Sequence, residues 1–75
     1  MEVQNIKGGR DYIDVYFSDN VVRIPGELIK GGFVADYDGI SEWKDGKPIS
    51  DKEKRKIALA IMKKTKGSHM VIYFE

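Results

Sequence analysis

The stretch that decides the fold reads IPGELIKGGFVA and covers residues 24–35. A strand-like run reaches Pro25 and Gly26, crosses a short apolar bridge, and resumes after Gly31 and Gly32. Proline lacks the N–H that a central strand donates, and glycine adopts backbone angles closed to other residues. We therefore expect one strand to stop at Pro25 and a new strand to begin after the two glycines.

The segment before this stretch alternates between apolar and polar side chains over residues 11–18. A period of two is typical of a half-buried strand. One face would carry Ile13, Val15 and Phe17, and the opposite face would carry Tyr12, Asp14 and Tyr16. A short strand over residues 1–6 precedes this segment. A two-residue turn at Asp19 and Asn20 leads to a return strand over residues 21–24.

The segment after the two glycines predicts further strands. Residues 33–37 form a fourth strand, and residues 40–44 form a short fifth strand that pairs with it as a hairpin. The C-terminal run, residues 69–75, is apolar on both faces. Because a strand of that kind is covered on both sides, we expect it inside the sheet and not at its edge.

One helix has a clear start. Ser50 is followed three residues later by Glu53, which is the spacing of a reciprocal capping box. The helix should cover about residues 51–66 and end at Gly67. Leu59 lies off the apolar stripe of this helix, so it is either a surface position or a sign of broader burial, and we favour broader burial.

The chain has 75 residues, enough for one small domain over residues 1–75. With 41% hydrophobic residues it can form a core. The expected class is α+β, a mostly antiparallel sheet of four to five strands with one helix packed on one face. The predicted core consists of Ile13, Val15, Phe17, Val22, Ile24, Phe33, Ile57, Ile61, Ile72 and Phe74.

Catalytic motifs are missing from the sequence. His69 is the one histidine, and no serine has the base and acid that a nucleophile needs. The acidic residues 36–42 do not have the spacing of a calcium loop. The glycine pairs lack the strand–loop–helix context of a phosphate site. We therefore expect no enzymatic activity, no catalytic residue, no cofactor and no metal.

Targeting signals are also missing. No run approaches the roughly 20 apolar residues of a membrane helix. Residues 1–5 lack the basic start and apolar core of a secretory signal. The absence of cysteine excludes disulfides and suits a reducing compartment. The expected location is the cytoplasm, with no membrane partner.

The net charge of +1 conceals an uneven distribution. Residues 36–51 contain five acids and two lysines, whereas residues 52–66 contain seven cations and one acid. The simpler interpretation is a solvated helix whose C-terminal lysines complement its dipole, and the alternative is a charged docking surface. Nucleic-acid binding is disfavoured because the cations are distributed around the helix and the chain is nearly neutral.

Two sets of residues could contact a protein partner. The first is the outward strand face, where two tyrosines flank an acid. The second is the acidic segment with interleaved aromatic residues, where the rings would pack and the carboxylates would select the partner. The candidate contact residues are Tyr12, Asp14, Tyr16, Asp36, Tyr37, Asp38, Glu42, Trp43 and Asp45. The alternatives are that the tyrosines only cover the sheet and that Trp43 packs into the core.

The chain resembles the immunity protein 74 family. The resemblance rests on residues 24–28, residues 31–35, Trp43 and the acidic segment that precedes the capped helix. Members of this family are small bacterial antitoxins with an α+β fold, encoded beside polymorphic toxins. The resemblance implies that this chain binds and neutralises a cognate protein toxin, and it transfers no contact residue. A generic interaction module stays open as the alternative, with an exposed edge strand that pairs with a second copy.

Overall fold

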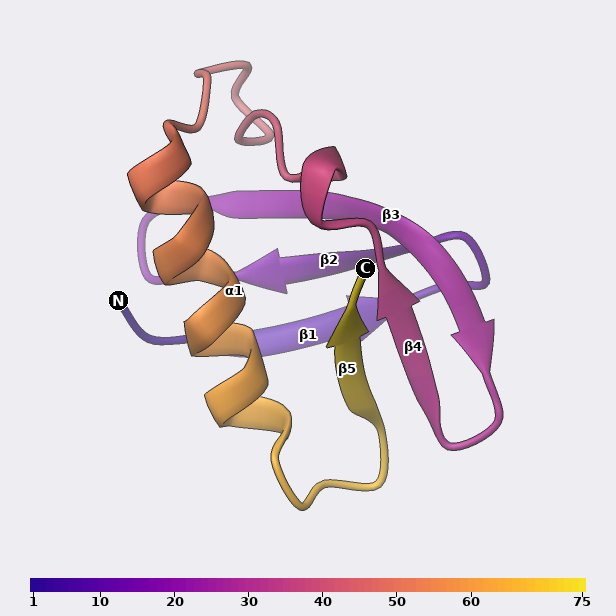
Figure 1. Cartoon of the computed structure of the whole chain (residues 1–75). Coiled ribbons are helices and arrows are strands. Elements are labelled where there is room, and N and C mark those ends of the chain that lie inside the picture. Colours follow the sequence, from indigo (N-terminus) through magenta and orange to yellow (C-terminus); the bar gives the residue numbers. More distant parts are fainter.

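A computed structural model describes the whole chain, residues 1–75, and shows an α+β fold (Figure 1). Five strands follow one another in the sheet in chain order: β1 (Asn5–Gly8), β2 (Tyr12–Tyr16), β3 (Val21–Ile29), β4 (Gly32–Ala35) and β5 (Val71–Phe74). Neighbours among the first four are antiparallel, and β5 is parallel to β4. The predicted class, a mostly antiparallel sheet with a single α-helix, is confirmed.

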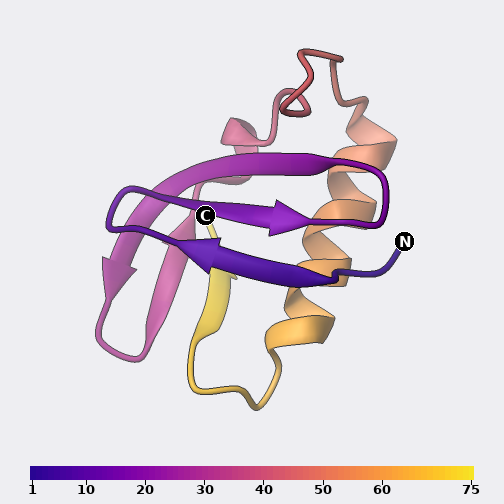
Figure 2. The same cartoon turned by 180° about the vertical axis from the view of Figure 1, so that it is seen from behind.

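The sheet coils so that its two ends lie in different layers. In Figure 1 the helix α1 (Asp51–Thr65), β4 and β5 lie in front, and β1, β2 and the first half of β3 lie behind. Figure 2 shows the same strands from the other side, with β1 to β3 now in front of the helix. The long strand β3 belongs to both layers, and the core fills the space between them.

The core contains 13 buried hydrophobic residues. Nine of the ten predicted core residues are among them, whereas Phe74 is only partly buried against the cluster. Val3, Ala35, Ile40 and Ala58 are additional members. The alternation over residues 11–18 therefore assigned the inward face of β2 correctly.

The predicted stop at Pro25 is wrong, because β3 continues from Val21 to Ile29. What changes at this point is the pairing partner. Pro25 lies opposite Tyr12 of β2, and the next residue, Gly26, lies opposite Ala35 of β4. The carbonyl of Pro25 accepts a hydrogen bond from the N–H of Asp36 at 2.8 Å. Proline is tolerated here because only its carbonyl is needed.

Gly26 is required at this junction by close packing. A Cβ atom at this position would lie 2.2 Å from the carbonyl oxygen of Val34 and 2.5 Å from the ring of Phe33. These distances are far below van der Waals contact. The absence of a side chain at Gly26 therefore lets β4 approach β3 where the sheet passes from one layer to the other.

The predicted strand over residues 40–44 is absent. β4 ends at Ala35, and a 3₁₀ helix, η1 (Tyr37–Gly39), follows directly. The carboxylate of Asp36 accepts the N–H of Asp38 at 3.1 Å, which starts η1 and turns the chain away from β4. The segment after η1 makes only isolated bridges, from Trp43 to Val22 and from Glu42 to Pro48.

β5 lies at the edge of the sheet, so its predicted interior position is wrong. On each of the two outer strands, a side chain of the protein itself accepts a hydrogen bond from one backbone N–H group. In β5 the N–H of Ile72 donates to Thr65 Oγ1 at 3.3 Å, and in β1 the N–H of Ile6 donates to Asn5 Oδ1 at 2.9 Å. β1 itself starts later than predicted and extends to Gly8.

The helix forms where its sequence signals place it. Ser50 Oγ accepts the N–H of Glu53 at 3.2 Å, and the Glu53 carboxylate accepts the N–H of Ser50 at 3.2 Å. Gly67, with a φ of 77°, follows the C-cap Lys66. The prediction of broad burial is wrong, since Leu59 is 62% exposed.

Candidate functional site

Asp14 is at the centre of the most organised polar cluster of the molecule. It lies on the outward face of β2, directly opposite Arg23 of β3, and its side chain is only 10% exposed. Arg23 Nε donates to Asp14 Oδ1 at 2.8 Å, and a terminal guanidinium nitrogen donates to Oδ2 at 3.0 Å. Lys44 Nζ lies 3.6 Å from the same carboxylate. The acid is thus paired on both oxygens.

The electrostatics follow from this geometry. The hydrogen bonds from Arg23 lower the pKa of Asp14, and the charges of Arg23 and Lys44 add to the effect against the opposing cost of burial. The same contact raises the pKa of Arg23. Asp14 is therefore a fixed carboxylate at neutral pH. It orders two cations and is not a candidate proton donor or acceptor.

The flanking tyrosines are each covered by a cation. The guanidinium of Arg23 lies 4.0 Å from the ring centre of Tyr12, and Lys7 Nζ lies 5.6 Å from that of Tyr16. We define the tyrosine face as Lys7, Tyr12, Asp14, Tyr16, Arg23 and Lys44. It contains three cations and one acid, so this face is positively charged. The strands that carry it are nearest the viewer in Figure 2.

The carboxylates of the acidic segment hold the local backbone. Asp36 caps η1, and Asp38 pairs with Lys54 of α1 at 3.3 Å. Asp45 accepts the N–H of Lys47 at 3.0 Å and the side-chain amide of Asn20 at 3.3 Å. These three acids therefore fasten the connection between β4 and α1. The exposed Glu42 belongs to the same connection.

The aromatic residues of this segment pack inward. Trp43 is partly buried against the core and meets the ring of Phe17 edge-on, with ring centres 5.8 Å apart. Tyr37 makes the same kind of contact with Phe74 at 6.3 Å, and Lys54 Nζ lies 4.6 Å from its ring centre. The structure thus places Trp43 as an anchor of the loop, in line with the alternative of inward packing.

The nine predicted contact residues fall into separate places. Tyr12, Asp14 and Tyr16 lie together on the outward face of β2, whereas the others lie at the N-cap of η1, in η1 and in the connection that follows it. Sequence reasoning missed Lys7, Arg23 and Lys44. The register of β2 and β3 could have shown that Arg23 faces Asp14. The predicted two-residue turn, however, would place Tyr16 opposite Arg23. The real connection covers residues 17–20 and brings Asp14 there.

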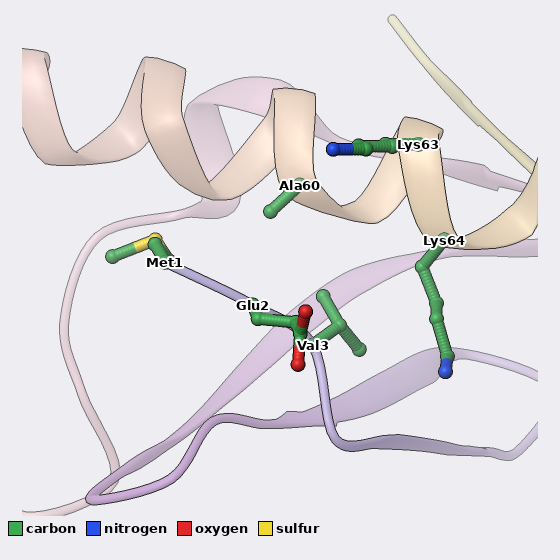
Figure 3. Close-up of a pocket in the computed structure, with 6 residues that line it drawn as sticks. All are labelled: Met1, Glu2, Val3, Ala60, Lys63 and Lys64. Carbon is green, nitrogen blue, oxygen red and sulfur yellow. The ribbon is translucent and has the colours of Figure 1, made fainter.

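A hollow of about 300 Å³ lies between residues 1–3 and α1, and Figure 3 shows Lys63 and Lys64 pointing in different directions beside it. None of the ion pairs joins Glu2 to either lysine. No group of three His, Cys, Asp or Glu side chains could hold a metal ion. None of the helices has the length and apolar character needed to cross a bilayer.

Comparison with known proteins identifies the family. The sequence profile of the family described as Immunity protein 74 matches residues 5–75, from the first residue of β1 to beyond the end of β5. No curated protein and no solved structure shows a significant match to the chain. The match covers every strand, the helix and the tyrosine face. The chain therefore belongs to the immunity protein 74 family.

Proposed function

We propose that this immunity protein is an antitoxin that binds a cognate bacterial toxin directly and blocks it in the cytoplasm of the producing cell. The observation that carries the proposal is the family match over residues 5–75. The protein acts by covering a surface of the toxin, and its own side chains make and break no bond.

The tyrosine face is our candidate for the toxin contact. Tyrosine and arginine are the residue types that contribute most to protein interfaces. Here Arg23 is held by Asp14 and by the ring of Tyr12, so little conformational freedom remains to be lost on binding. The segment from Asp36 to Asp45 supports this face through Lys44, whose ammonium group reaches Asp14.

Copurification tests the proposal. The chain would be expressed with an inactivated product of the toxin gene next to its own gene, and the dissociation constant of the complex measured by calorimetry. We expect Tyr12→Ala and Tyr16→Ala each to weaken binding about tenfold, equal to about 1.4 kcal/mol. Leu59→Ala on the exposed side of α1 is the matched control and should leave binding unchanged. Protection of cells without any complex would contradict direct neutralisation.

The alternative of a self-pairing module has less support. Edge strands pair with other chains through free backbone groups. In this chain Asn5 and Thr65 occupy central N–H groups of the two outer strands. Light scattering should therefore give the mass of one chain at micromolar concentration, and a stable dimer would favour the alternative.

A further inference from the structure

A second outward face lies beyond Pro25. Its residues come from the second half of β3, from β4 and β5, and from the residue that directly follows each of these last two strands. The strand register places Glu27, Val34 and Tyr73 in one row and Ile29, Gly32 and Val71 in the next. We define the β3–β5 face as Glu27, Ile29, Val34, Asp36, Val71, Tyr73 and Glu75. Its strands are at the front of Figure 1, beside the helix.

The β3–β5 face exposes apolar side chains that no element of the chain covers. Tyr73 is 52% exposed and Ile29 is 41% exposed, and Val34 and Val71 between them are half-buried. Contiguous exposed apolar side chains on a small protein mark interaction surfaces more often than isolated ones do. The exposed apolar side chains of this face therefore indicate a contact with another molecule.

A shallow hollow of about 390 Å³ adjoins these apolar side chains at Val34. Its charged lining consists of Glu27, Asp36 and Glu75, and no lysine or arginine lines it. None of these three carboxylates takes part in an ion pair. They do not form a group that could hold a metal ion. The hollow is thus a negative site without an internal counterion.

We propose that the β3–β5 face receives a basic segment of the toxin, with a lysine or arginine side chain in the carboxylate-lined hollow. This inference rests on the proposed antitoxin function and specifies the chemistry of the partner. A long cationic side chain combines an apolar stem with a charged tip. The stem would lie against Val34 and Tyr73, and the tip would meet Glu27, Asp36 and Glu75.

The two outward faces lie on opposite sides of the molecule and are joined by the continuous strand β3. Arg23 and Pro25 lie on the outward side of its first half, and Glu27 and Ile29 lie on the outward side of its second half, which belongs to the other layer. A standard interface takes about 800 Å² from each protein, and the whole chain exposes 5156 Å². A toxin that contacts both faces would have to extend around β3, and the opposite charges of the two faces would fix its orientation.

Charge reversal tests the inference. The double variant Glu27→Lys/Glu75→Lys would be compared with the control Glu2→Lys/Asp19→Lys, which has the same change in net charge at exposed positions outside both faces. The probe is the inactivated product of the adjacent toxin gene. We expect the first variant to weaken binding at least thirtyfold and the control less than threefold. Equal effects, or tighter binding by the first variant, would overturn the inference.

A second variant separates the apolar part from the charged part. Tyr73→Ser should weaken binding about tenfold at both low and high salt, whereas the effect of Glu27→Lys/Glu75→Lys should shrink as salt rises. If the wild-type complex forms and only the tyrosine-face variants weaken it, the basic-segment inference is wrong and the antitoxin function stands. If wild-type protein and toxin form no complex, both proposals fail.

Discussion

The two halves of β3 differ in how far their side chains are buried and in whether their outward charges are paired. In the first half, Val22 and Ile24 are fully buried, and the outward Arg23 is held in an ion pair. In the second half, Leu28 and Ile29 are exposed, and the outward Glu27 has no cationic partner. The difference shows that one continuous strand can contribute stability at one end and an unsatisfied surface at the other.

The largest expected effect on the free energy of unfolding comes from adding a side chain at Gly26, which lies between the two halves of β3. Gly26→Ala would place a methyl group against the Val34 carbonyl and the Phe33 ring, and we expect it to destabilise the fold by about 3 kcal/mol or more. Urea denaturation measures the change. Gly46→Ala is the control, because Gly46 has open space and only a φ of 92° to oppose it, and it should cost about 1 kcal/mol. Similar values for both would remove the special role of Gly26.

The next effect compares one side chain at two positions of the same strand. Ile24→Ala should cost about 3 kcal/mol, because it leaves a cavity at a site with 0% exposure. Ile29→Ala should change the free energy of unfolding by about 0.5 kcal/mol or less. Thermal and urea unfolding of the two variants would measure both values. A large cost for Ile29→Ala would mean that the second half also belongs to the core.

A smaller effect concerns Asp14 of β2, which pairs with the first half of β3, and Glu27 of the second half. Asp14→Asn should cost about 1 kcal/mol near neutral pH, because it removes a charged partner of Arg23. The folded-state pKa of Asp14 is lowered, so its contribution is complete above about pH 5 and fades as the pH falls below about 4. Urea unfolding from pH 7 to pH 3 should show the difference from wild type shrinking. Glu27→Gln removes no ion pair and should leave the free energy of unfolding near neutral pH almost unchanged.

The smallest expected effect lies outside the strand. Asp38 pairs with Lys54 at 3.3 Å, but its side chain is 92% exposed. Asp38→Asn should therefore cost about 0.5 kcal/mol or less, and 0.5 M salt should remove the difference. A loss comparable to that of Asp14→Asn would show that the contact between η1 and α1 stabilises the fold more than its exposure implies.

The features that local sequence predicted are those set within a few residues. The capping box of Ser50 and Glu53 placed the helix, and the alternation through Ile13, Val15 and Phe17 placed the inward face of β2. The register of β2 and β3 depended on the length of one turn. The edge position of β5 depended on a long-range parallel pairing that no local pattern indicates.

The candidate surfaces also divide into residues set by local pattern and residues set by long-range pairing. Tyr12, Asp14 and Tyr16 follow from alternation alone. Predicting Arg23 as part of this surface requires the register of β2 and β3. Predicting Lys44 requires the bridge from Trp43 to Val22, which the predicted hairpin does not contain. The sequence does not predict the β3–β5 face, because it predicts a strand end at Pro25. Glu27 and Ile29 join this face only because β3 continues to Ile29.

The parallel pairing of β4 with β5 has a consequence for biosynthesis. Phe33 and Ile72 lie side by side in the sheet, although α1 and its connections separate them in sequence. The strands β1 to β4 can associate as soon as each emerges, whereas the core stays open until Ile72 arrives. We expect the nascent chain to gain cooperative structure only after β5 leaves the ribosome, so a product that ends before β5 should not fold.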